Sequence, residues 1–328
     1  MKAFSTASHL LIAFFLLVAI GCNKDDDFLP ADLSSFYRLE SFEVGVIPKS
    51  RTVQVLFQVK DYDLKGNADL TEEDFIVTEN EGNIDSEADL RVGRSSIPFS
   101  IRTVLLLDIT RSVEGLIPQI KDAAKVLIQN KMPEQEIAIY TFDSQTIERQ
   151  SFTDNREELI AAINAIPETG LVNSTNLYGG VIEVANLWED NYSIDGIVDG
   201  SLVIFTDGRH NASQTVDLND ALNALGDRRA YVAALSSPDL DEGALQSLAK
   251  ENDRYFKADD IAGLEQMFID IQEEIQSLSN SIYFLYYQSP ISDPSPYENT
   301  LKIEVRNNAN FGGDSRISEK FNSVGFGD

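Results

Sequence analysis

The chain has 328 residues, with 54 acidic against 26 basic side chains and a formal net charge of −28. A hydrophobic content of 43% allows a large core and excludes a disordered chain, while so acidic a surface disfavours nucleic-acid binding. One cysteine excludes an internal disulfide framework, and two histidines leave little for zinc or histidine-dependent catalysis. The length suits two domains.

The first 21 residues predict a lipoprotein signal peptide. Lys2 precedes an apolar run, Leu10 to Ile20, that is too short to cross a bilayer but suits a signal peptide. The run ends in Ala19-Ile20-Gly21-Cys22, which resembles a bacterial lipobox, although Ala19 stands where leucine is most common. This resemblance implies that Cys22 is lipidated and becomes the mature N-terminus. The alternative is an ordinary signal peptide with an incidental cysteine.

Residues 22–35 predict a lipidated acidic tether. The segment Asn23-Lys24-Asp25-Asp26-Asp27 resembles the surface-export signal of Bacteroidota lipoproteins, and Asp25 to Ser35 shows neither helical nor strand periodicity. We therefore expect an outer-membrane lipoprotein exposed on the cell surface, held to the membrane by its lipid anchor. A periplasm-facing anchor is the alternative. No transmembrane helix is predicted further along the chain.

Residues 99–279 alternate between predicted strands and helices. Apolar runs, as expected of strands buried on both faces of a parallel sheet, occur at Val104–Leu107, Ile137–Phe142, Leu202–Phe205 and Tyr231–Leu235. Amphipathic helical stripes separate or follow them, beginning at Leu116, Leu177 and Leu264, with the second reaching Trp188. This alternation predicts a doubly wound α/β fold with a mostly parallel sheet, in which ligands bind beyond the carboxyl ends of the strands.

The flanking segments, residues 36–98 and 280–328, predict one discontinuous β-sandwich. Strand patterns occur at Val53–Val59, Ile282–Tyr287 and Leu301–Val305, and Asp293–Pro296 supplies turn residues. Two separate β pieces are less favoured, because each has too few strands for its own core. The segment from Asp61 to Glu72 has partial EF-hand spacing, but its strand-like flanks favour a hairpin turn.

Polar side chains follow three of the elements in the α/β region. Asp108, Thr110 and Ser112 come directly after a buried strand, Thr175 precedes a helix, and Asp207 follows the next buried strand. These side chains are expected to meet at the carboxyl edge of the sheet. Two carboxylates with three hydroxyls make an all-oxygen site that suits a hard divalent cation such as Mg²⁺.

In this order, the five residues resemble the metal-ion-dependent adhesion site of von Willebrand factor type A domains. The Rossmann-like pattern of residues 99–279 resembles the fold of the same domains. Thr206-Asp207-Gly208 matches fully, while Thr110 stands in place of the first serine of the Asp-x-Ser-x-Ser motif. The resemblance implies that Thr110, Ser112 and Thr175 ligate Mg²⁺ or Mn²⁺, with Asp108 and Asp207 completing the shell. The alternative is a site that keeps the fold without metal, with its hydroxyls capping helices and turns.

The resemblance also implies that the metal captures an Asp or Glu carboxylate of a partner, either another protein or a surface polymer. Since the chain is acidic, we expect a single carboxylate on a neutral or basic partner surface. His210 is expected to be an exposed loop residue, and contact with the partner is the alternative role for it. No catalytic constellation is found, so an enzyme is not expected. The competing function is a structural or assembly subunit of an envelope complex in which metal is secondary.

Overall fold

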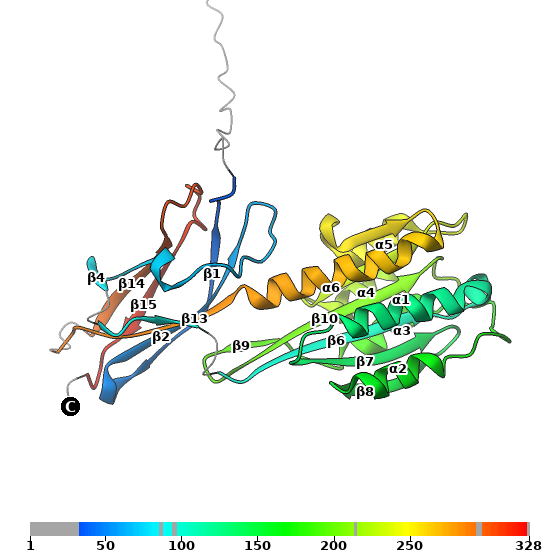
Figure 1. Cartoon of the computed structure of the whole chain (residues 1–328), viewed down its shortest axis with the longest axis horizontal. Helices are drawn as coiled ribbons and strands as arrows, with labels where there is room; N and C mark the ends of the chain where they lie inside the picture. The colour runs from blue at the N-terminus through cyan, green and yellow to red at the C-terminus, as the bar shows by residue number, and fades with distance from the viewer. Residues whose placement is uncertain (1–32, 85–87, 94–96, 213–214, 293–296, 327–328) are drawn as a thin grey trace, which may run out of the picture.

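The computed structural model describes residues 33–84, 88–93, 97–212, 215–292 and 297–326. These residues form two parts, a sheet covered by helices and an all-strand part. The two parts lie end to end along the long axis (Figure 1). The predicted signal peptide, Cys22 and nearly all of the tether lie outside the described residues, as do the turn residues Asp293–Pro296. Among the described helices, none is long and apolar enough to cross a membrane.

The first part is built on a seven-stranded sheet, counted over the described residues, with the order β12-β11-β10-β6-β7-β8 and β9 paired to β10. Five strands run parallel, while β8 and β9 pair antiparallel with β7 and β10. The strands are β6 (Phe99–Asp108), β7 (Gln135–Phe142), β8 (Thr146–Thr153), β9 (Asn191–Ser193), β10 (Gly196–Thr206), β11 (Arg229–Leu235) and β12 (Tyr255–Ala258).

Helices cover both faces of this sheet. The helices are α1 (Ile117–Gln129), α2 (Arg156–Asn164), α3 (Leu177–Ala185), α4 (Leu218–Leu225), α5 (Glu242–Ala249) and α6 (Leu264–Asn280). The apolar faces of α1, α2 and α6 share one core with the sheet, and those of α3, α4 and α5 share the other. The doubly wound, mostly parallel α/β fold predicted from the sequence is confirmed.

The helices of the structure follow the apolar stripes predicted from the sequence, with one difference. Pro118 lies in the first turn of α1, where its missing N–H breaks no intrahelical hydrogen bond. The stripe that begins at Leu177 ends early, because α3 stops at Ala185. Trp188 lies beyond the helix but is only 3% exposed, and it packs into the same core as α3.

The second part is a β-sandwich made from both ends of the chain, as predicted. Its strands are β1 (Arg38–Ile47), β2 (Thr52–Lys60), β3 (Phe75–Glu79), β4 (Gly82–Ile84), β5 (Arg91–Val92), β13 (Ile282–Gln288), β14 (Glu298–Val305) and β15 (Arg316–Asn322). Within the described residues they form two four-stranded sheets, ordered β1-β2-β13-β5 and β15-β14-β3-β4, around one apolar core. After β2 the chain makes a tight turn closed by an isolated bridge between Lys60 and Gly66, so this segment is a turn, although β3 then pairs in the other sheet and no two-stranded hairpin forms.

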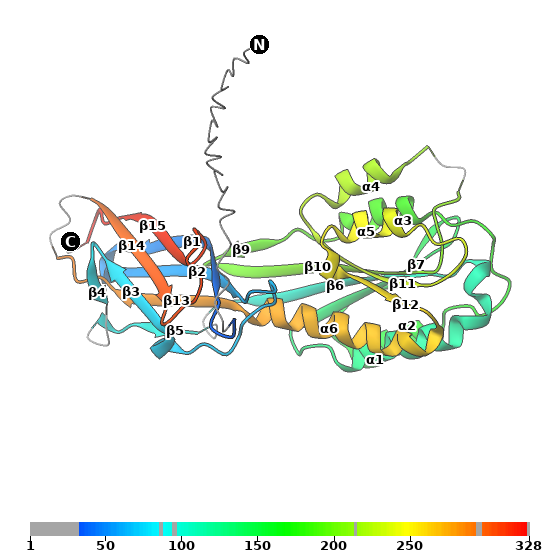
Figure 2. The same cartoon turned by 90° about the horizontal axis from the view of Figure 1, so that it is seen from above.

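Close packing joins the sandwich to the α/β part. Figure 2 shows α6 leading directly into β13 of the sandwich. The side-chain amide of Gln58 on β2 donates to the carbonyl of Leu278 near the end of α6 and to the hydroxyl of Ser281, both at 2.9 Å. On the other side of the junction, Phe42 of β1 stacks on Tyr192 of β9 with ring centroids 4.5 Å apart. The junction is therefore a built interface rather than a flexible linker.

Asp199, on the half of β10 that reaches the sandwich, is the charged centre of this junction. Its side chain is 1% exposed and forms an ion pair with Arg229 of β11. It also accepts hydrogen bonds from the hydroxyls of Tyr192 and of Ser279 on α6, both at 2.5 Å. One buried carboxylate thus links β9, β10, β11 and the end of α6.

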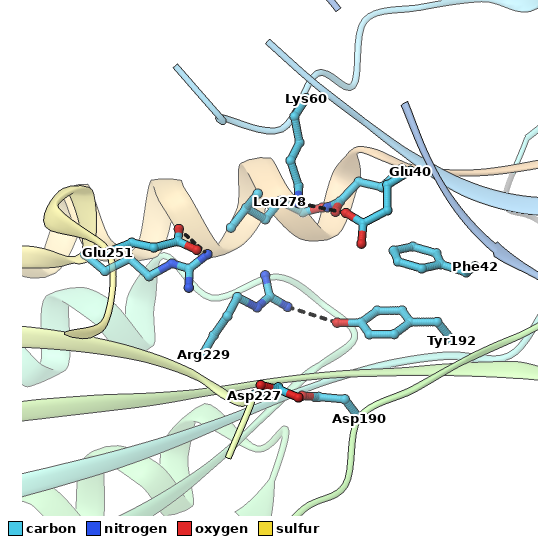
Figure 3. Close-up of a pocket in the computed structure, with 11 residues that line it drawn as sticks. Glu40, Phe42, Lys60, Asp190, Tyr192, Asp227, Arg229, Glu251 and Leu278 are labelled. Atoms are coloured by element: carbon cyan, nitrogen blue, oxygen red, sulfur yellow. Dashed lines mark hydrogen bonds and ion pairs between the residues drawn. The ribbon is translucent and has the colours of Figure 1, made fainter. Parts of the chain in front are cut away.

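A crevice of about 320 Å³ opens between the two parts beside this junction (Figure 3). The three basic side chains that line it are each engaged: Lys60 lies 3.2 Å from Glu40, Arg254 lies 2.9 Å from Glu251, and Arg229 pairs with the buried Asp199. Because these cations already have anionic partners, the crevice acts structurally as part of the domain junction.

Candidate metal centre

Asp108, the last residue of β6, is the buried centre of the candidate site. Its side chain is fully buried, and its Oδ1 accepts hydrogen bonds from the backbone N–H of Thr110 at 2.9 Å and from the Thr110 hydroxyl at 2.7 Å. Its Oδ2 accepts from the hydroxyl of Thr206, the last residue of β10, at 2.7 Å. Burial raises the pKa of this carboxyl to about 6, even though the hydrogen bonds act in the opposite direction.

Ser112 connects this cluster to the second acid. Its hydroxyl donates to Oδ1 of Asp207 at 2.8 Å and lies 3.0 Å from the hydroxyl of Thr110. Asp207 follows β10 directly and is 6% exposed. Four of the five residues predicted from the sequence, Asp108, Thr110, Ser112 and Asp207, therefore lie in one continuous chain of short contacts at the carboxyl edge of the sheet.

Thr175, the fifth predicted residue, lies at the same edge on a separate loop. Its backbone N–H donates to the side-chain carbonyl of Asn211 at 2.7 Å, and its carbonyl accepts from the Asn211 N–H at 3.0 Å. The loop before it is held to the first cluster, since the N–H of Arg111 donates to the carbonyl of Val172. The described hydrogen bonds of Thr175 run to Asn211 and Ala212, in the loop after β10, rather than to the other four residues.

Within the described residues, the two acids of the site have no cationic partner. Neither Asp108 nor Asp207 forms an ion pair with a lysine, arginine or histidine in the described residues. Burial raises the pKa of Asp207 as well as that of Asp108. An unpaired buried carboxylate is costly, and a bound cation is one way to relieve that cost.

The hydroxyl oxygens also suit a cation. Each hydroxyl has one proton, and those of Thr110 and Ser112 are directed at the two carboxylates. The two oxygens, 3.0 Å apart, therefore face each other with lone pairs. Hydroxyl and carboxylate oxygens are hard ligands of the kind that Mg²⁺ prefers, so the donor set fits a divalent metal.

A cluster of acids and histidines alone would not reveal this site. No group of three or more His, Cys, Asp or Glu side chains is placed to hold a metal in the described part of the chain. Of the metal-free alternative, helix capping does not describe Thr110 or Thr175, whereas the bonds from Thr110 to Asp108 are contacts within a turn. Thr110 precedes the short 3₁₀ turn Arg111–Leu116 without a capping bond from its side chain, and Asn176 rather than Thr175 caps α3.

Two residues outside the predicted set contribute to the geometry. Thr206 orients Asp108, and its place in the Thr-Asp-Gly motif was the available signal for it. Asn211 positions the loop of Thr175, and nothing in its local sequence pattern indicates that role.

His210 differs from the sequence expectation of an exposed loop residue. Its ring is half-buried and stacks on Tyr178 of α3, with ring centroids 4.4 Å apart and an interplanar angle of 12°. Its Nδ1 accepts from the N–H of Tyr178 at 3.4 Å, and burial lowers its pKa, which favours the neutral ring. The ring of His210 is therefore half-buried because it packs against α3 of its own chain.

The family model for the von Willebrand factor type A domain matches residues 103–270, which is about half of the chain and contains every residue of the candidate site. The chain belongs to this family. Within this von Willebrand factor type A (vWA) fold, the candidate site lies at the carboxyl edge of the central sheet, where β6 and β10 end.

Solved structures with this fold are distant in sequence. The vWA structure from Catenulispora acidiphila is 11% identical, with a TM-score of 0.48, covering 90% of this chain and 75% of that one. The vWF domain of the type V pili tip protein Mfa5 from Porphyromonas gingivalis is 12% identical, with a TM-score of 0.46 and coverages of 55% and 96%.

Proximal thread matrix protein 1 from the mussel byssus is 13% identical, with a TM-score of 0.45, over 61% of this chain. The match spans about half, 51%, of the mussel protein. No curated protein matches the chain.

Proposed function

We propose that the protein binds a partner through a divalent cation held at the carboxyl edge of the vWA sheet. Asp108, Thr110, Ser112, Thr175 and Asp207 would hold the cation, Mg²⁺ or Mn²⁺. The observation that carries the proposal is the chain of carboxylates and hydroxyls, whose two acids have no cationic partner in the part of the chain that the structure describes.

The ligand set also suggests how a partner is bound. Three of the five side chains are neutral hydroxyls, which neutralise little of a cation's charge. A bound divalent cation would therefore supply an electrophilic centre for an Asp or Glu carboxylate of another protein or surface polymer. The residues of this chain hold the site rigid, since Asp108 is anchored by three hydrogen bonds before any ligand arrives. This is a binding role, and no catalytic role is proposed.

We further propose that the protein is an outer-membrane lipoprotein anchored through Cys22 and exposed on the cell surface. The support is the sequence of residues 1–35, with its short apolar run, single cysteine and acidic tether. Protease treatment of intact cells tests the side of the membrane: cleavage supports surface exposure, and protection favours the periplasm-facing anchor.

The binding role is tested by capturing cell-envelope proteins on the immobilised protein in Mg²⁺ and then adding a chelator. We expect bound protein to be released by the chelator and to be absent with Asp108→Ala. Asp239→Asn, which changes a 79% exposed acid near the same edge, is the matched control and should retain capture. Capture that survives both the chelator and Asp108→Ala would favour the structural or assembly role, in which metal is secondary.

A further inference from the structure

Two exposed arginines adjoin the candidate metal centre. Arg111 lies between the predicted ligands Thr110 and Ser112, and Arg209 lies two residues after Asp207. Both side chains are exposed, and that of Arg209 retains 62% of its accessible surface. In a chain with a net charge of −28, these are two of only 26 basic side chains, and both lie beside the candidate ligands.

The charges of both arginines are available to a partner. Arg111 forms no ion pair within the part of the chain that the structure describes. The guanidinium of Arg209 lies 4.0 Å from a carboxylate oxygen of Asp239, whose side chain is 79% exposed. Water and salt screen an exposed pair at that distance, so a better-placed carboxylate can replace it.

The nearby acids, by contrast, are engaged by donors of their own chain. Glu114 accepts from the N–H of Gly170 at 2.8 Å, and Asp143 accepts from the N–H of Gln145 at 2.9 Å. Two further acids at this edge cap helices, Asp217 at the start of α4 and Asp241 at the start of α5. The arginines therefore have fewer interactions within the described chain than the acids around the site.

Building on the proposed metal-dependent capture, we propose that Arg111 and Arg209 bind a second acidic group of the partner. The partner segment would be an acidic peptide with one carboxylate for the metal and at least one more beside it for a guanidinium. Arginine suits this task because its planar fork can bind a carboxylate through two parallel hydrogen bonds. This proposal departs from the sequence expectation of a single carboxylate on a neutral or basic surface.

The overall acidity of the chain does not prevent such recognition. At about 0.15 M ionic strength the Debye length is roughly 8 Å, so exposed charges farther than that from the site are largely screened. Charges next to the bound carboxylate act within that distance and therefore decide the local preference. Arginine charges at the rim of a binding site are also expected to increase the association rate.

The test uses the full chain in saturating Mg²⁺ and two capped fluorescent peptides, Gly-Gly-Asp-Gly-Gly and Gly-Glu-Asp-Glu-Gly. The wild type should bind the three-acid peptide at least fivefold more tightly than the one-acid peptide. Arg111→Gln with Arg209→Gln should reduce that ratio to below twofold while leaving Mg²⁺ binding, measured by calorimetry, unchanged. Arg316→Gln, which removes the same charge from a 57% exposed arginine of the sandwich, should keep the wild-type ratio.

The outcomes separate this inference from the proposed function. A peptide preference that persists in the double variant, or no preference in a wild type that binds Mg²⁺, overturns the role of the arginines alone. Absence of Mg²⁺ binding, or peptide binding that is unchanged by a chelator, overturns the proposed metal-dependent capture and this inference with it.

Discussion

Replacing Asp108 by asparagine is expected to stabilise the metal-free protein. The carboxylate is fully buried, has no cationic partner in the described residues and has a pKa raised by burial from 3.8 to about 6. Each unit of pKa shift corresponds to about 1.4 kcal/mol, so the ionised carboxylate lowers the free energy of unfolding at pH 7 by about 3 kcal/mol. Asparagine keeps the shape of the side chain and removes the charge.

The hydrogen bonds reduce this gain. The asparagine amide N–H₂ replaces one of the two carboxylate oxygens that accept from Thr110 and Thr206, and each altered bond is worth about 1 kcal/mol. We therefore expect a net stabilisation of about 1–2 kcal/mol. For a chain of 328 residues, that corresponds to a rise in Tm of roughly 1–3 °C.

The pH dependence follows from the same shift. The destabilising effect of Asp108 is fully present above its folded pKa of about 6. It decreases as the pH falls from about 6 to the unfolded value of 3.8, because the folded protein takes up the proton first. The stability advantage of Asp108→Asn should therefore be largest at neutral pH and disappear near pH 4.

Thermal and urea unfolding in a chelator and in Mg²⁺ measure these effects. Mg²⁺ at 100 times its Kd should stabilise the wild type by about 2.7 kcal/mol and leave the variant unchanged. Asp143→Asn, at an acid of the same edge with backbone donors, is the matched control and should retain the metal response. The reasoning is refuted if Asp108→Asn is less stable than the wild type in chelator by more than about 1 kcal/mol.

Substitutions at three further positions test other parts of the structure. Thr110→Ser should keep Mg²⁺ binding while Thr110→Val weakens it at least tenfold by calorimetry, and equal affinities would exclude a role for the hydroxyl. Asp199→Ala removes the ion-pair partner of Arg229, which keeps the Tyr192 hydroxyl and the nearby Asp190, and should lower the urea-derived stability by about 1–3 kcal/mol, whereas an unchanged stability would contradict the junction described above. Gly200→Ala places a methyl group against the indole of Trp188 and should lower stability by about 1–3 kcal/mol, and an unchanged Tm would show that the indole can move.

The sequence predicts the long, regular elements because their apolar residues follow one period. The stripe of α6 and the buried runs of β6 and β10 are examples, since both faces of these strands lie under helices. The edge strand β8, Thr146–Thr153, lacks that signal because its side chains are mostly exposed or half-buried. Trp188 continues a helical spacing beyond the end of α3, which shows that burial outside a helix can imitate its stripe.

In the candidate site, too, some features have a local sequence signal and others do not. Its chemistry is readable from the sequence because Asp108, Thr110 and Ser112 are close in the chain and Asp207 ends a recognisable strand. The supporting contacts cannot be predicted from the sequence, because they depend on how separate loops meet. Asn211 bonds to Thr175 across 36 residues, and His210 is half-buried only because Tyr178 lies beside it.

Calorimetric titration of Mg²⁺ into the protein, beside Asp108→Ala and Asp207→Ala, tests the proposed metal centre most directly. We predict saturable binding at one site in the wild type and none in either variant, because the two carboxylates lie at opposite ends of the chain of contacts through Thr110 and Ser112. A folded wild type that binds no Mg²⁺, or variants that bind as the wild type does, would contradict the proposal that these residues hold a metal.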